Sequence, residues 1–115
     1  MKSILIIEQD RPVAHRLALA CLEQGIGTAL VDTVCEGVRL LLSDTVSLIV
    51  VEASLLRLGA REQAVLFDRV APGVPVAIAA PPNTPLERRV RWELAGFAVV
   101  PRPASVEDLL KIPAR

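Results

Sequence analysis

The sequence has few cysteines, few aromatic residues and no net charge. Its two cysteines, Cys21 and Cys35, are too few for a disulfide scaffold and lack metal-site spacing, so we expect both to be reduced, partly buried thiols. The 13 basic and 13 acidic residues balance, which removes the electrostatic attraction that an autonomous nucleic-acid binder needs. The composition therefore predicts no nucleic-acid partner.

The chain also lacks long hydrophobic runs. Apolar stretches such as residues 4–7 and 48–51 are four residues long, whereas a membrane-spanning helix needs about 20. The first of these stretches ends at Glu8, before the apolar length of a secretory signal is reached. We therefore expect no membrane contact and a cytoplasmic location.

Short apolar runs alternate with stretches of helical spacing along the 115 residues, of which 52% are hydrophobic. The apolar runs predict five strands, at residues 3–7, 27–31, 47–51, 74–79 and 97–100. The helical spacing predicts four helices, at residues 11–24, 34–43, 60–71 and 85–95, and a short fifth helix between Ser105 and Pro113. In the segment 85–95, we expect the apolar positions Leu86, Val90 and Leu94 to face the core.

Helix-capping residues support these boundaries. Three segments fit the capping-box pattern, namely 33–36, 84–87 and 105–108. We expect Asp10 to cap the first helix and Pro85 to take the first position of the fourth. Gly25 and Gly96 lie just past two helical runs, where the left-handed residue that ends a helix is usually glycine.

The strand patterns indicate an α/β fold. Residues 4–7 and 48–51 are unbroken apolar runs, which is typical of strands that helices cover on both faces. Five successive βα units with right-handed crossovers give a doubly wound, five-stranded parallel sheet with helices on both faces. We therefore predict one domain over residues 1–115.

Ligands of an open α/β sheet bind beyond the carboxyl ends of its strands. Glu8 and Gln9 follow the first predicted strand, Glu52 follows the third, Ala80 ends the fourth and Arg102 follows the fifth. Two carboxylates and a guanidinium are thus expected to converge. The sequence contains no P-loop, dinucleotide fingerprint, HExxH or G-x-S-x-G motif, and we expect no enzymatic activity.

Over essentially its whole length the chain resembles the receiver domains of bacterial two-component response regulators. The resemblance rests on four stretches: ILIIEQD (4–10), LIVVE (48–52), PGVPVAIAA (72–80) and GFAVVPRP (96–103). It implies a flavodoxin-like receiver fold, a role in signal transduction, and a cis peptide bond before Pro103.

The chain departs from the family pattern at the positions that carry its phosphorelay chemistry. The acidic pair that holds magnesium in the family reads Glu8-Gln9, and the phosphoacceptor aspartate is Glu52. The other changes are Ala80 for the hydroxyl residue, Arg102 for the lysine and Val99 for the switch aromatic. The resemblance therefore implies a degenerate or pseudo-receiver, which keeps the fold and binds protein partners without conventional aspartyl phosphorylation and without a cofactor.

Two alternatives stay open at this point. In one, the domain is an active phosphorelay receiver, with weak magnesium binding at Glu8 and Glu52. In the other, it is a flavodoxin-like domain that binds a small ligand at the strand ends. Glu52 itself has two interpretations, because its carboxylate either mimics a phosphorylated state by reaching toward Arg102 or forms a partly exposed ion pair with it.

In the receiver family, partners bind the face formed by the fourth helix, fifth strand and fifth helix. Here that face carries Arg88, Arg89, Arg91, Trp92 and Val99, and arginine and tryptophan are enriched in interface hot spots. The resemblance thus implies a protein partner or a homodimer at this face. The alternative is a solvated helix face on which Glu87 pairs with Arg91 and Trp92 lies over the edge of the core.

Overall fold

A five-stranded parallel sheet forms the centre of the molecule. The computed structural model describes residues 3–114, and its strand order is β2-β1-β3-β4-β5, with every neighbouring pair parallel. The strands are β1 (Ser3–Ile7), β2 (Gly27–Val31), β3 (Leu48–Glu52), β4 (Val76–Ala80) and β5 (Ala98–Pro101). The predicted sheet is confirmed, and Glu52 and Pro101, expected just beyond two strands, are their last residues.

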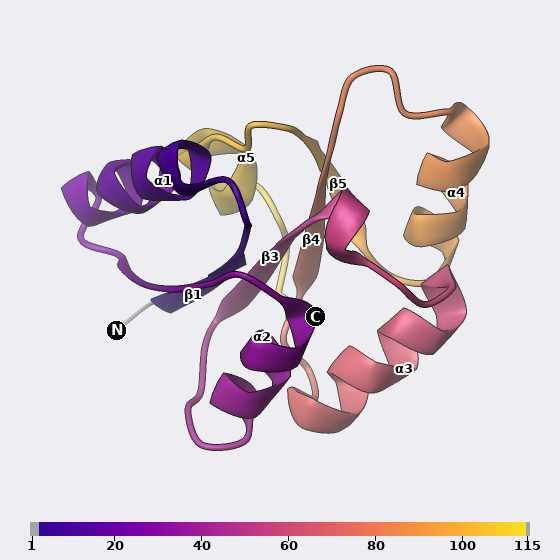
Figure 1. Ribbon diagram of the computed structural model, residues 1–115, viewed down its shortest axis with the longest axis horizontal. Coiled ribbons are helices and arrows are strands. Elements are labelled where there is room, and N and C mark those ends of the chain that lie inside the picture. Colours follow the sequence, from indigo (N-terminus) through magenta and orange to yellow (C-terminus); the bar gives the residue numbers. More distant parts are fainter. Residues whose placement is uncertain (1–2, 115) are drawn as a thin grey trace.

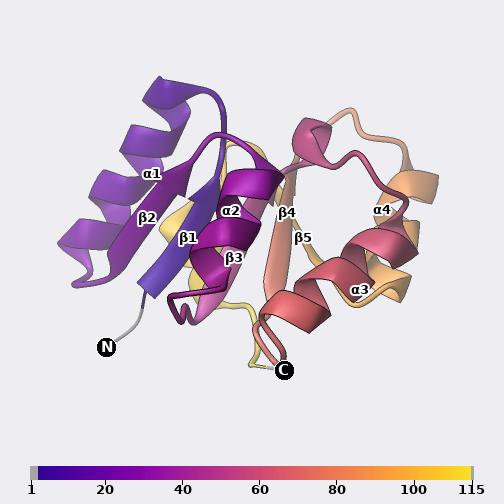
Figure 2. The same cartoon turned by 60° about the horizontal axis from the view of Figure 1, so that its bottom comes forward.

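Helices cover both faces of the sheet (Figure 1). They are α1 (Arg11–Glu23), α2 (Val34–Leu41), α3 (Ala60–Val70), α4 (Leu86–Leu94) and α5 (Val106–Leu110), with a 3-10 turn, η1 (Ala53–Leu55), after β3. In Figure 2, α2 and α3 lie in front of the sheet with α4 beside them, while α1 and α5 pack on the opposite face. The doubly wound architecture is therefore confirmed.

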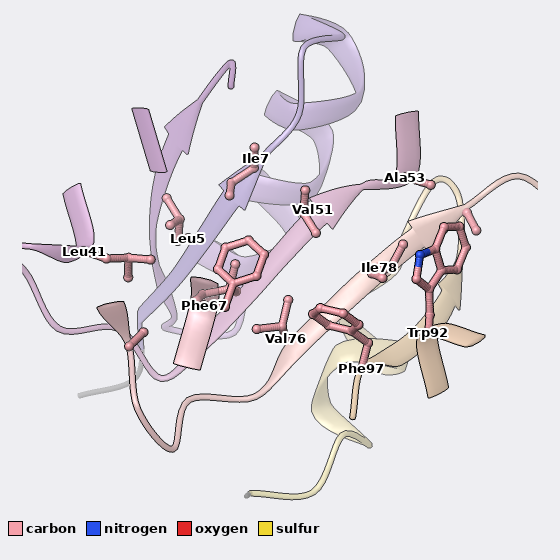
Figure 3. Close-up of a cluster of buried hydrophobic side chains, with 13 residues drawn as sticks. Leu5, Ile7, Leu41, Val51, Ala53, Phe67, Val76, Ile78, Trp92 and Phe97 are labelled. Atoms are coloured by element: carbon pink, nitrogen blue, oxygen red, sulfur yellow. The ribbon is translucent and has the colours of Figure 1, made fainter. Parts of the chain in front are cut away.

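Each face of the sheet has its own hydrophobic core. Alternate strand residues point to opposite faces, so that Leu5 and Ile7 join the cluster under α2, α3 and α4, whereas Ile4 and Ile6 join the cluster under α1 and α5. Figure 3 shows the first cluster, in which the Phe67 and Phe97 rings meet edge to face with centroids 6.4 Å apart. Burial on both faces explains the unbroken apolar runs of β1 and β3.

Several expected helix ends are present. The side chains of Asp10, Thr33 and Ser105 accept hydrogen bonds from backbone N–H groups in the first turns of α1, α2 and α5. Gly25 and Gly96 follow their helices with φ of +74° and +103°, which is the left-handed conformation that suits glycine.

The expected start of the fourth helix is wrong. Pro85 is the N-cap of α4 instead of its first helical residue, and no side chain caps this end. The Thr84 hydroxyl donates to the Pro81 carbonyl at 2.7 Å, so this side chain stabilises the turn before the helix.

The apolar face expected for this helix is also wrong. Leu86, Val90 and Leu94 are exposed, and Trp92 is the residue that α4 buries in the core. A single large indole fills the space between α4 and the sheet, so the three aliphatic residues face outward.

Among residues 3–114, two further expectations concern the cysteines and membrane-spanning helices. Cys21 is buried but Cys35 is exposed on α2, so the expected burial holds for one thiol only. Within this part of the chain, no helix is both long and apolar enough to cross a membrane.

Candidate functional site

The carboxyl ends of β1, β3, β4 and β5 bring together most of the residues singled out in the sequence. Glu8 directly follows β1 and Glu52 ends β3, and these strands are neighbours in the sheet. Ala80 ends β4, and its carbonyl accepts the backbone N–H of Arg102 at 2.9 Å. Because β4 lies between β3 and β5, the Arg102 side chain spans the end of β4, where Ala80 offers only a methyl group.

Arg102 bridges the two carboxylates. Its Nε and Nη2 donate to the two oxygens of Glu8 at 3.2 and 3.3 Å, and its Nε lies 3.6 Å from Oε1 of Glu52. The Glu8 and Glu52 side chains are 7% and 8% exposed, and that of Arg102 is 29% exposed. The hydrogen bond to Glu8 is the main cause of the raised pKa of Arg102, so the guanidinium stays charged.

The backbone and a serine also donate hydrogen bonds to the two carboxylates. Oε2 of Glu8 accepts the Asp10 N–H at 3.0 Å. Oε2 of Glu52 accepts the Ser54 N–H at 3.0 Å and also the Ser54 hydroxyl. Buried carboxylates are tolerated only when they are paired and hydrogen-bonded, and both conditions are met within this cluster of Glu8, Glu52, Arg102 and Ser54, which we call the carboxylate cluster.

Some of these contacts were not predicted from the sequence. Arg102 makes its hydrogen bonds to Glu8, a pairing that the sequence did not predict. Its contact with Glu52 joins a buried carboxylate to a guanidinium that is 29% exposed, which agrees with the expected partly exposed ion pair. Ser54 was not singled out, although its position two residues after Glu52 was a usable signal. Gln9 lies outside the cluster with an exposed side chain. The peptide bond between Arg102 and Pro103 is cis.

The cavity beneath the two carboxylates, between α1 and the sheet, is small. The cavity that Glu8 and Glu52 help to line measures about 10 Å³, whereas pockets for small ligands usually measure about 300–1,000 Å³. Among residues 3–114, no three His, Cys, Asp or Glu side chains are grouped so that they could hold a metal ion. The guanidinium already occupies the position between the two carboxylates that a cation would need.

The expected partner face is only partly exposed. Trp92 is 6% exposed and packs in the core (Figure 3), with the Arg88 guanidinium carbon 5.1 Å from the centroid of its ring. Arg91 pairs with Glu87 at 2.6 Å, Arg89 is exposed and Val99 is half-buried. The packing of Trp92 and the pairing of Glu87 with Arg91 agree with the alternative of a solvated helix face.

The fold is similar to that of solved receiver domains. A CheY-like response regulator receiver domain protein from Methanospirillum hungatei JF-1 matches with a TM-score of 0.80 and 21% identity, over 96% of this chain and 89% of that one. A two-component response regulator from Clostridium difficile matches with a TM-score of 0.81 and 20% identity, over 96% and 90% of the two chains. The beryllofluoride-activated NtrC4 receiver domain dimer matches with a TM-score of 0.81 and 17% identity, over 96% and 91%.

In the sequence comparisons, no protein-family model and no curated protein matches the chain. The structural matches cover nearly the whole chain, and they establish its architecture and not its activity, because one fold hosts many functions. The chain therefore has the flavodoxin-like receiver fold, and the carboxylate cluster lies at the carboxyl ends of its strands.

Proposed function

We propose that this chain is an atypical receiver domain that takes part in cytoplasmic signal transduction by binding protein, without conventional aspartyl phosphorylation and without enzymatic activity of its own. The observation that carries the proposal is the bridge from Arg102 to both Glu8 and Glu52. The solved structures that share the fold include response regulators and their receiver domains, which supports the signalling role.

The cluster disfavours phosphoryl transfer because its groups are already engaged. A phosphoacceptor must be free to attack and must have donors around the transferred group. Oε2 of Glu52 is held by Ser54, and Oε1 faces Arg102. Ala80 has no hydroxyl to donate, and Arg102 directs its hydrogen bonds to Glu8.

Magnesium does not fit this arrangement as a resident ion. Mg²⁺ in proteins is held by one or two carboxylates together with water. In this cluster both carboxylates, Glu8 and Glu52, already face the Arg102 guanidinium. A cation would have to displace the guanidinium from a two-point interaction with Glu8. Weak, displaceable binding is the most that this site supports.

The cavity of about 10 Å³ that Glu8 and Glu52 line together with apolar residues of α1 and the sheet is too small for a ligand. The surface formed by α4 and β5 instead supports contact with another protein. Arg88, Arg89 and Arg91 are exposed on α4, next to half-buried Val99 on β5, and arginine is enriched at protein interfaces.

The proposal is tested by incubating the protein with acetyl phosphate and magnesium and measuring its intact mass, with a conventional receiver domain as positive control. We expect no phosphoryl adduct on this chain. A stable adduct on Glu52 would overturn the proposal. In a second arm, the double variant Gln9→Asp/Glu52→Asp measures whether family residues restore labelling while Arg102 is still present, and we expect little or none.

A further inference from the structure

We propose that the chain forms a symmetric homodimer through the free edge of β2, in which the β2 strands of two copies pair antiparallel and join their sheets. Both β2 and β5 are edge strands, because each has a single neighbour in the sheet. An edge strand presents unpaired backbone N–H and C=O groups, and natural proteins usually protect such edges with proline, charged side chains or bulges. The two edges of this sheet differ in that protection.

The edge of β5 is protected by a proline. The Arg102 N–H donates to the Ala80 carbonyl, so the backbone groups of Arg102 point toward β4. Because these groups alternate in direction along a strand, those of Val99 and Pro101 point outward. Pro101 has no N–H to donate, so a strand added at this edge would lack a hydrogen bond.

The edge of β2 has no such protection. The Val31 carbonyl accepts the N–H of Glu8, which directly follows β1, so the backbone groups of Thr28 and Leu30 point outward. Residues 27–31 contain no proline and no charged side chain, and their register with β1 runs without a bulge. Every residue of β2 is at least partly exposed, whereas β3 and β4 are buried throughout. This edge therefore offers two donors and two acceptors to another strand.

The outward groups of β2 fit a second copy of the same strand. About a two-fold axis at Ala29, Thr28 of each copy lies opposite Leu30 of the other, and each of these pairs exchanges two hydrogen bonds. The ion pair of Arg11 with Asp32 lies at the carboxyl end of β2. Asp32 is three residues from the axis, so the two ion pairs are about 20 Å apart. The strands that pair are themselves uncharged, so their pairing brings no like charges together.

An exposed leucine of α1 lies beside the same edge. Arg11 contacts Asp32, which directly follows β2, so the side of α1 that carries Arg11 faces β2. Leu22 follows Arg11 by about three helical turns, which places it on the same side of α1, and its side chain is 68% exposed. Antiparallel pairing puts the α1 helices of both copies on one face of the joined sheet. A second copy thus brings apolar surface toward Leu22, which an extended peptide would not do.

This inference goes beyond the proposed function, because β2 lies at the opposite edge of the sheet from β5. Phosphate labelling is read as a mass change and dimer formation as a molecular weight, so either proposal can fail without the other.

The first test is the oligomeric state of the protein by sedimentation equilibrium over micromolar to hundreds of micromolar concentrations, where we expect a reversible dimer. Thr28→Pro removes an outward N–H without breaking the ladder to β1, and Thr28→Lys adds a charge to the edge. Each should raise the dimer dissociation constant by at least about tenfold. Val99→Pro, at an outward position of β5, is the matched control and should leave the dimer intact.

A monomeric wild-type protein, or a dimer that Thr28→Lys does not weaken, would overturn the proposal. A dimer that Val99→Pro weakens instead would place the contact at the other edge and would overturn it as well. Circular dichroism of each variant confirms that the fold is kept.

The second test measures the register of the paired strands. In an antiparallel pair centred on Ala29, the two Ala29 Cα atoms lie about 4.5 Å apart, which is within the range of a disulfide. Ala29→Cys, combined with Cys35→Ser to remove the exposed thiol, should give a covalent dimer with oxidised glutathione on a non-reducing gel. Val31→Cys in the same background is the control, because the two copies of residue 31 lie about 13 Å apart. No cross-link with Ala29→Cys, or equal cross-linking of both variants, would contradict the antiparallel arrangement.

Discussion

The carboxylate cluster and the outer face of α4 have opposite properties. At the cluster, charged side chains are buried, and Glu8, Glu52 and Arg102 find their partners within the molecule. On α4, apolar side chains are exposed, and Leu86 and Leu94 lie mostly in solvent. The buried charges of the cluster are paired within the molecule, whereas the outer face of α4 lies in solvent.

The comparison shows that buried charged side chains at the strand ends are balanced by each other within the molecule. Backbone N–H groups of Asp10 and Ser54 donate to Glu8 and Glu52, which satisfies the buried carboxylates at the ends of β1 and β3. We expect substitutions in the interior to cost more stability than substitutions on the outer face of α4.

The largest effect is expected on the inner face of α4. Trp92→Ala removes an indole that is 6% exposed, and it should lower the free energy of unfolding by about 3–5 kcal/mol. Urea denaturation measures this loss. An effect below about 1 kcal/mol would show that Trp92 is not part of the core.

The next effect is expected at the carboxylate cluster. Arg102→Met leaves Glu8 and Glu52 buried without their counter-charge, which should cost about 3 kcal/mol of unfolding free energy. Arg16→Met, at an exposed arginine of α1, is the control and should change stability by less than about 0.5 kcal/mol. Equal effects of the two substitutions would contradict the bridging role of Arg102.

A smaller effect is expected at Ser54. Ser54→Ala removes the hydroxyl that donates to Glu52 but keeps the backbone N–H that does the same. We expect a loss of about 1 kcal/mol in urea denaturation. A neutral result would show that the backbone donor alone is enough to hold Glu52.

Leu94→Ala should have the smallest effect on stability. The side chain is 84% exposed, so the monomer should lose less than about 0.5 kcal/mol when measured at dilution. A loss as large as that of Trp92→Ala would remove the contrast between the two faces of α4.

The two cysteines give a separate test of interior against surface. Burial raises the pKa of the Cys21 thiol, while Cys35 is exposed. Iodoacetamide should therefore modify Cys35 at least about tenfold faster, as followed by mass. Because the folded-state pKa of Cys21 is the higher one, its contribution to stability is present below the unfolded-state pKa and is lost as pH rises through the folded-state value.

Much of the fold could be predicted from the sequence, because burial on both faces leaves unbroken apolar runs in β1 and β3. The prediction of the buried face of α4 was wrong for a physical reason. Leu86, Val90 and Leu94 have the spacing of a core-facing stripe, and periodicity cannot tell which of two apolar faces meets the sheet. Trp92, with its larger apolar area, takes that place.

The site could be predicted in its members but not in its pairing. Glu8, Glu52 and Arg102 follow from the rule for strand ends, whereas the choice of Glu8 as hydrogen-bond partner depends on the side-chain path across the end of β4. Gln9 illustrates a second limit, because it lies in a bend after β1, and the rule for strand ends does not give the direction of each side chain there. Glu8 is buried and Gln9 is exposed.

The most direct test of the central claim, that the carboxylate cluster is closed to phosphoryl chemistry, is an amide NMR titration with magnesium and then with beryllofluoride. We predict no saturable shifts at Glu8, Glu52 and Arg102 and no change along α4. Saturable shifts at the cluster that spread to α4 would contradict this account and show that the pocket still works as a receiver switch.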